Sequence, residues 1–219
     1  MKIQRSVLFT LLTLCSALAM SGCGEPVARN QGVYMLIDTS GTYTEELGKA
    51  QQVINYTLAR MNPGDSFAVA SINTGSFSEK NIQAKVTFDD RPSVTNKQKQ
   101  AFQNAIDSFV QNAKPAAYTD ITGGLLQAVE FLNEKQPGRK TILIFSDLKE
   151  ELKEGYNRDI PLGLEGFDLV ALNVTKLRTD NLDPSEYLNR LQQWQEKVEQ
   201  GGGSWRVVND LERLEKILH

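Results

Sequence analysis

Asp38, Ser40 and Thr42 are the residues of this sequence whose types and spacing are best suited to chemistry. They follow the apolar run 33–37, which is typical of a buried strand, so one carboxylate and two alternating hydroxyls arrive together at a turn. Such hard oxygen ligands suit Mg²⁺ or Mn²⁺, whereas zinc favours thiolate or imidazole groups. The spacing therefore indicates binding through a metal more than it indicates catalysis.

A second strand end carries another carboxylate, at Asp147. The run Thr141–Phe145 before it is apolar without alternation, as expected for a strand that is buried on both faces. Hydrophobic periodicity and turn residues predict the other elements. The strands are expected over 33–38, 66–72, 82–88, 167–174 and 205–208, and the helices over 44–61, 95–110, 122–134, 185–199 and 211–218.

This alternation of strands and helices predicts a doubly wound, mostly parallel α/β sheet flanked by helices. Ligands of such sheets bind beyond the carboxyl ends of the strands, near the point where the strand order reverses. Asp38 and Asp147 are far apart in the sequence, yet both should reach that edge of the sheet.

The segment that begins at Asp38 also permits other interpretations. An Asp followed by Thr-Ser-Gly is often only a turn. The segment is similar to the first motif of haloacid-dehalogenase-type phosphohydrolases, in which Asp38 would be the nucleophile, but Ser40 stands where that chemistry needs a second carboxylate. The extra Ser40 also breaks the aspartic-protease motif. Ser–His hydrolysis is excluded because the one His is His219, and no Gly-rich nucleotide loop follows the first strand.

Three separated segments together resemble the von Willebrand factor type A family and its metal-ion-dependent adhesion site. They are Asp38-x-Ser40-x-Thr42, the stretch 118–125 that opens a predicted helix, and the stretch 144–147 at a strand end. The resemblance covers roughly residues 31 to 219 and implies a Rossmann-like fold. It also implies a binding domain and not an enzyme.

In that family the matching positions hold a divalent cation, so the resemblance implies a set of metal ligands: Asp38, Ser40, Thr42, Thr119 and Asp147. It further implies a vacant coordination position that a protein partner fills with an acidic side chain. Thr42 stands where Ser is commoner, and Leu148 where many relatives have Gly, which leaves the loop shape after Asp147 open. An interaction domain of this fold that binds no metal is a remaining alternative.

Several residues near the candidate site also have structural interpretations. Thr119 and Asp120 are both types that cap helices, and we favour the cap for Asp120. The charged run 149–154 is typical of a solvated face, with acids at the rim of the site as the alternative. Trp194 and Trp205 are expected to pack in or near the core and not to form a ligand box.

The N-terminus predicts export and lipidation. Lys2 and Arg5 precede the apolar stretch 7–20, which is too short to span a bilayer and is typical of a secretory signal. The stretch 20–23, Met-Ser-Gly-Cys, resembles the lipobox of bacterial lipoproteins, with an ordinary signal peptide as the alternative. The resemblance implies removal of residues 1–22 and an acyl anchor such as palmitate on Cys23. The polar stretch that follows predicts a tether over 23–32, and the remaining length suits one domain over 33–219. Gly24 favours the outer membrane if the source is Gram-negative.

The composition limits the possible partners. Removing Lys2 and Arg5 with the signal from the 24 basic residues leaves 22 against 27 acidic residues, a net charge of about −5, without a basic run. Nucleic acid is therefore an unexpected partner, and so is an anionic lipid surface recognised by charge. We expect the lipid on Cys23 to be the membrane link. Cys23 would then be the single cysteine, so no internal disulfide is possible.

Overall fold

The computed structural model describes residues 30–177, 180 and 183–211. The predicted signal peptide, Cys23, most of the tether and all but the first residue of the predicted closing helix lie outside these residues. None of the described helices is both long enough and apolar enough to cross a membrane.

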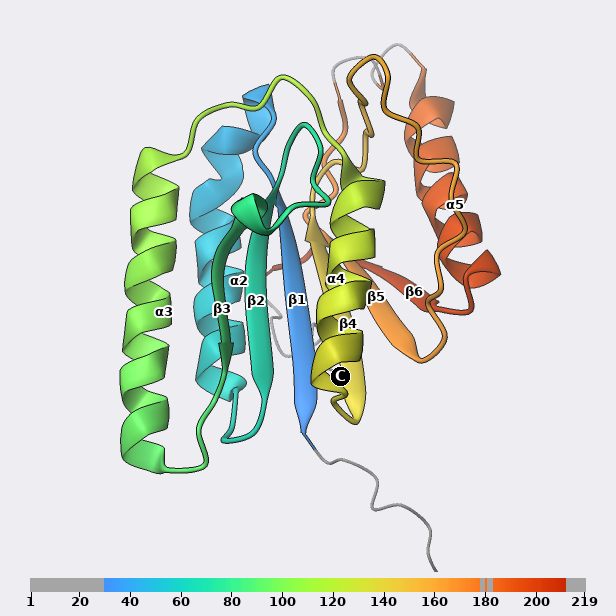
Figure 1. The fold of residues 1–219 in the computed structure, drawn as a ribbon. Coiled ribbons are helices and arrows are strands. Elements are labelled where there is room, and N and C mark those ends of the chain that lie inside the picture. Colours follow the sequence, from blue (N-terminus) through green and yellow to red (C-terminus); the bar gives the residue numbers. More distant parts are fainter. Residues whose placement is uncertain (1–29, 178–179, 181–182, 212–219) are drawn as a thin grey trace, which may run out of the picture.

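Six strands form one sheet in the order β3-β2-β1-β4-β5-β6 (Figure 1). Their bounds are Gln31–Asp38 for β1, Ser66–Ile72 for β2, Ile82–Thr87 for β3, Arg139–Phe145 for β4, Phe167–Leu172 for β5 and Ser204–Val208 for β6. Strand β3 pairs antiparallel with β2, and the other neighbouring strands in this sheet are parallel. The predicted doubly wound, mostly parallel fold is therefore confirmed.

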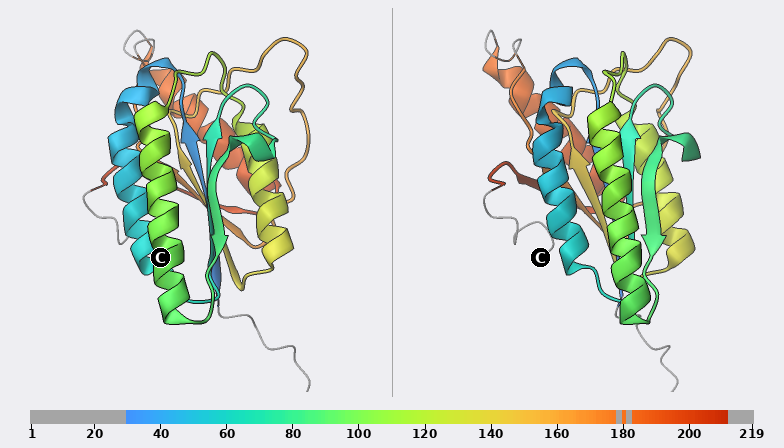
Figure 2. Two further views of the ribbon diagram at one scale, coloured as in Figure 1. Left: turned by 60° about the vertical axis from the view of Figure 1, so that its left-hand side comes forward. Right: turned by 90° about the vertical axis from the view of Figure 1, so that its left-hand side faces the viewer.

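Helices cover both faces of the sheet, which explains why the central strands are apolar without alternation. Helices α2 (Leu47–Arg60) and α3 (Pro92–Asn112) supply one core, and α4 (Ile121–Lys135) and α5 (Pro184–Gln200) supply the other. Successive residues of β1 alternate between these cores, since Met35 belongs to the first and Leu36 to the second. Two views in Figure 2 show α2 and α4 on opposite sides of the sheet.

The first helix begins later than its apolar pattern predicts. A 3₁₀ turn, η2, occupies Gly41–Glu46, and α2 follows only from Leu47. The Ser40 carbonyl accepts hydrogen bonds from the backbone N–H groups of Tyr43 and Thr44, at 2.8 and 3.2 Å, and this pattern tightens the chain directly after Asp38. The predicted start at residue 44 is therefore wrong for the α-helix.

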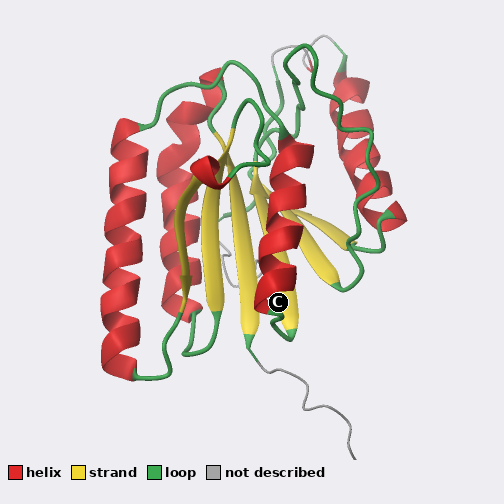
Figure 3. Cartoon of the chain, viewed as in Figure 1, coloured by secondary structure: helices red, strands yellow, loops and turns green. Residues whose placement is uncertain are grey.

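Other boundaries move by a few residues for local reasons. Strand β1 starts at Gln31, whose backbone N–H donates to the Asp65 carboxylate at 2.8 Å, so the last two residues of the predicted tether belong to the sheet. Strand β5 ends at Leu172, because Asn173 takes a left-handed conformation with φ of 53°. The loops after β1, β2 and β4 leave the sheet at one common edge (Figure 3).

Candidate metal site

Two buried carboxylates meet at that edge. Asp38 is the last residue of β1 and is fully buried, and Asp147 follows β4 and is 5% exposed. Strands β1 and β4 are parallel neighbours, so their carboxyl ends lie side by side. The topology thus places the two predicted Asp residues as the sequence indicated.

Hydrogen bonds fix the orientation of the Asp38 carboxylate. Its Oδ1 accepts from the backbone N–H of Ser40 at 2.8 Å, and its Oδ2 accepts from the hydroxyl of Ser146 at 2.7 Å. Ser146 is fully buried and also accepts from the Leu148 N–H at 3.0 Å. Sequence reasoning did not assign a role to Ser146, although its place directly before Asp147 brings it to the same strand end.

Thr119 reaches the same region through backbone pairing of its loop. The Ala116 N–H donates to the Thr39 carbonyl at 2.8 Å, which lays this loop beside the turn after β1. On the other side, Thr119 exchanges two backbone hydrogen bonds with Glu151, at 2.8 and 2.9 Å. Thr119 is 2% exposed. These backbone bonds place it between the turn after β1 and Glu151.

The remaining predicted ligands lie in the turn itself. Ser40 is half-buried, and its hydroxyl hydrogen-bonds the Asp38 carboxylate and lowers the pKa of Asp38. The backbone of Thr42 lies in the 3₁₀ turn η2, and its side chain is outside the part that the structure describes. Asp38, Ser40, Thr119 and Asp147 are thus brought to one edge.

The electrostatics of the site favour an incoming cation. Burial raises the pKa of Asp38, although hydrogen bonds from Ser146 and Ser40 partly offset this rise. Burial also raises the pKa of Asp147 to about 6, the Lys149 backbone N–H lowers it, and the Asp38 charge raises it further. Two carboxylates that resist ionisation together are stabilised in their charged forms by a nearby positive charge.

The donor set agrees with a hard divalent cation, because each candidate ligand atom is a carboxylate or hydroxyl oxygen. Among the residues that the structure describes, no group of three or more Asp, Glu, His or Cys side chains is arranged to hold a metal ion. With the side chains where the structure places them, a cation bound between Asp38 and Asp147 would rely on hydroxyls and water for its other ligands. Mg²⁺ commonly keeps several waters, so the set fits.

Asp120 caps a helix, as the sequence indicated. It is the N-cap residue of α4, and its Oδ1 accepts from the Gly123 N–H at 2.8 Å. The same carboxylate accepts from the Ser76 N–H at 2.9 Å and receives two hydrogen bonds from the Arg158 guanidinium, at 2.9 and 2.7 Å. The sequence did not reveal Arg158, because its segment is a long loop without periodicity.

Leu148 shows how the loop after Asp147 accommodates a residue other than Gly. Its φ of 66° lies in the left-handed region that Gly adopts easily, and its side chain is 1% exposed within the core. The indole Nε1 of Trp194 donates to the Leu148 carbonyl at 2.9 Å. Core packing and this hydrogen bond together hold a Leu in a conformation that favours Gly. Trp194 is buried in that core, as predicted.

We expect Leu148→Gly to be less destabilising than Leu148→Ala, by about 1 kcal/mol. Both variants lose the buried side chain and should therefore be less stable than the wild type, by roughly 2–4 kcal/mol. Ala keeps the cost of a left-handed residue, whereas Gly removes it. Urea unfolding of the two variants measures the difference, and an Ala variant as stable as the Gly variant would contradict a strained Leu148.

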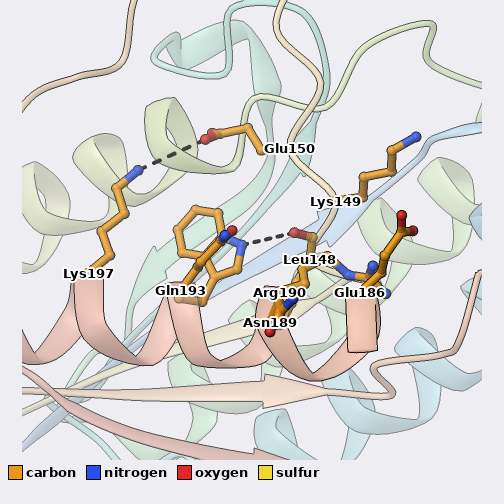
Figure 4. Close-up of a pocket in the computed structure, with 9 residues that line it drawn as sticks. Leu148, Lys149, Glu150, Glu186, Asn189, Arg190, Gln193 and Lys197 are labelled. Atoms are coloured by element: carbon orange, nitrogen blue, oxygen red, sulfur yellow. Dashed lines mark hydrogen bonds and ion pairs between the residues drawn. The ribbon is translucent and has the colours of Figure 1, made fainter. Parts of the chain in front are cut away.

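Two cavities flank the candidate site. One, of about 460 Å³, lies between α5 and the loop after Asp147, with Lys149 and Lys197 at its opposite ends (Figure 4). Lys197 donates to the Thr122 hydroxyl at 2.6 Å, and Glu150 accepts from that same residue. The other cavity, of about 410 Å³, lies beside Thr39 on the far side. Lys149 and Glu150 of the charged run 149–154 therefore line a cavity and are not only a solvated face.

No protein-family model and no curated protein matches the sequence. Solved structures share its fold. One is a von Willebrand factor type A protein from Catenulispora acidiphila, with 15% identity and a TM-score of 0.53, over 86% of this chain and 41% of that chain. Another is the open conformation of the pilus adhesin SpaC from Lactobacillus rhamnosus GG, with 12% identity and a TM-score of 0.54, over 88% of this chain and 29% of that chain. The chain thus has the von Willebrand factor type A fold and spans less than half of either protein.

Proposed function

We propose that this chain is an interaction domain, and not an enzyme, which binds a protein partner through Mg²⁺ or Mn²⁺. The proposed metal ligands are Asp38, Ser40, Thr42, Thr119 and Asp147. The observation that carries the proposal is the pair of buried carboxylates at the switch-point edge of a von Willebrand A fold, each with its pKa raised. The adhesin with the same fold agrees with a role in interaction.

Each residue would make a separate contribution. Asp38, oriented by Ser146, and Asp147 would supply negative charge, and the Ser40 and Thr119 hydroxyls would supply neutral oxygens. Two carboxylates offset a divalent charge only partly where water lies between them and the ion, so the bound cation would attract one further carboxylate. We propose that the partner offers this group from an acidic side chain.

The proposal is tested by thermal unfolding with Mg²⁺ and with chelator. Mg²⁺ should raise the melting temperature of the wild type, because a ligand at about 100 times its Kd stabilises the folded state by about 2.7 kcal/mol. Asp38→Ala should lose this shift. Asp90→Ala is the matched control, since Asp90 is exposed and follows β3, whose end lies at the opposite edge of the sheet.

Three outcomes would contradict the proposal. If neither Mg²⁺ nor Mn²⁺ changes the melting temperature of the wild type, the proposed metal binding is wrong. Partner capture that survives chelation indicates an interaction domain that binds no metal. Turnover of a generic phosphate ester, abolished by Asp38→Asn, indicates a haloacid-dehalogenase-type phosphohydrolase instead.

We further propose that a lipid on Cys23 anchors the domain to the extracytoplasmic side of a membrane. The lipobox resemblance supports this idea, and the fold is compatible with it. The described chain enters β1 at the edge opposite Asp38, so an anchor that precedes β1 leaves the candidate site on the far side of the domain (Figure 1). Such a site would face outward, toward a partner.

Labelled fatty acid should be incorporated into the wild type and into Cys15→Ala, but not into Cys23→Ala. The reason is that acylation requires the thiol of Cys23, whereas Cys15 lies within the predicted signal. The cells of the native host are grown with the labelled fatty acid, each chain is then purified, and its label is measured. Incorporation into Cys23→Ala would refute the anchor and leave the proposed metal site untouched.

A further inference from the structure

Glu151 lies opposite Thr119 in an isolated antiparallel bridge. The Thr119 N–H donates to the Glu151 carbonyl at 2.8 Å, and the Glu151 N–H donates back at 2.9 Å. Residues directly opposite in such a pair project their side chains on the same face, with Cβ atoms about 5 Å apart. The Glu151 side chain therefore leaves the backbone on the side of the Thr119 hydroxyl.

The charge of Glu151 acts on the candidate site. Its carboxylate is among the groups that raise the pKa of Asp38, so it lies within electrostatic reach of that buried side chain. The Glu151 side chain is also 51% exposed, so core packing does not fix it in place. It combines a place opposite Thr119, within electrostatic reach of Asp38, with freedom to change its rotamer.

Lys149 now restrains this carboxylate. Its Nζ lies 2.5 Å from the Glu151 Oε1, and both side chains are about half exposed. The Lys149 charge also lowers the pKa of Asp147, so the ion pair borders both carboxylates of the site. An exposed ion pair contributes only about 0–1 kcal/mol, and a divalent cation nearby can therefore break it.

We propose that Glu151 is an internal ligand of the candidate metal site, held away by Lys149 until a divalent cation binds. This inference rests on the proposed metal-binding function. A third carboxylate would offset the part of the cation's charge that Asp38 and Asp147 do not offset. It would take the coordination position offered to a partner, so a partner's acidic side chain would have to displace Glu151.

Mn²⁺ titration of the full chain, followed by electron paramagnetic resonance, tests the proposal. Glu151→Gln should weaken Mn²⁺ affinity by about 10-fold, because ligand charge tunes such sites. Glu154→Gln is the matched control: it removes the same charge from an exposed residue of the same loop and should change affinity by less than about twofold. Lys149→Met should tighten binding several-fold, because it frees Glu151 and removes a positive charge.

Acetate separates coordination from a general effect of charge. At constant ionic strength, acetate should restore Mn²⁺ affinity in Glu151→Gln and have no effect on the wild type, whose own carboxylate already fills the position. Equal affinities for Glu151→Gln and Glu154→Gln, or a Gln variant that acetate does not rescue, would overturn the role of Glu151. A wild type that binds no Mn²⁺ would instead overturn the proposed function itself.

Discussion

Replacing Asp120 by Ala should lower the free energy of unfolding by about 3–5 kcal/mol, the cost typical of breaking a buried ion pair from one side. The Asp120 side chain is 2% exposed and accepts hydrogen bonds from Gly123, Ser76 and Arg158. Its loss would leave the Arg158 guanidinium, on a side chain that is 16% exposed, without this ion pair and would remove the N-cap of α4. Urea denaturation measures the change, with an unaltered m-value as the sign that the folded state is retained.

A double-mutant cycle measures how much of this loss in the free energy of unfolding comes from the contact between Asp120 and Arg158. Asp120→Ala and Arg158→Ala together should cost less than the sum of the single changes, with a coupling of about 1–3 kcal/mol. Asp159→Ala, the neighbouring exposed acid, should stay within about 0.5 kcal/mol of the wild type. An Asp120→Ala protein that loses under about 1 kcal/mol would show that the carboxylate does not hold the loops together.

The contribution of the Asp120–Arg158 pair to stability changes with pH in a defined direction. Burial alone would raise the pKa of Asp120, but Arg158 and two backbone N–H groups outweigh it and hold that pKa below its usual value. The folded state therefore favours the ionised carboxylate. Its stabilising contribution is present above the pKa of the unfolded chain and is lost as the pH falls through the lower folded pKa.

Local sequence pattern was sufficient to predict the two carboxylates of the site. The apolar runs before Asp38 and Asp147 have no alternation, and this fixes them as buried parallel strands whose ends share one edge. Because β1 and β4 are parallel neighbours in the sheet, their pairing brings Asp38 and Asp147 together. Only the apolar runs are local signals; the pairing of β1 with β4 joins residues 108 positions apart, such as Gln31 and Arg139, and follows from the doubly wound fold.

Contacts made by residues in long loops could not be predicted in this way. Arg158 is 38 residues from Asp120, in a segment with no periodicity, so nothing local indicates the pair. Similarly, the Tyr43 hydroxyl donates to the Asn173 carbonyl across 130 residues. The start of α2 was misplaced for another reason: 3₁₀ and α turns share similar apolar spacing, and only the hydrogen bonds to the Ser40 carbonyl tell them apart.

In chelator, raising the pH from about 4 to about 6 should destabilise the wild type by about 2 kcal/mol relative to Asp147→Asn. Asp147 has its pKa raised to about 6 in the folded protein by burial and by the Asp38 charge. The folded state therefore keeps a proton that the unfolded chain has already released. The stabilising contribution of the Asp147 proton is complete below the pKa of the unfolded chain. It is lost as the pH rises through the pKa of Asp147 in the folded protein.

Asp147→Asn is the informative reference because it keeps the shape of the side chain and cannot ionise. Other carboxylates, such as Asp120 and Asp180, have lowered pKa values and give the opposite trend, but they contribute equally to both proteins and cancel in the comparison. Urea unfolding at several pH values measures the difference. A difference that does not change with pH would mean that Asp147 ionises as easily in the folded protein as in the unfolded chain.

Mg²⁺ should remove this destabilisation from the wild type at neutral pH and leave Asp147→Asn nearly unchanged. The reason is that a cation between Asp38 and Asp147 favours the ionised forms that burial opposes. A monovalent salt at equal ionic strength is the control, since it screens buried charges only weakly. Repulsion between two buried carboxylates would then be an energetic cost of the metal-free domain that cation binding relieves, which links the stability of the fold to the occupancy of the site.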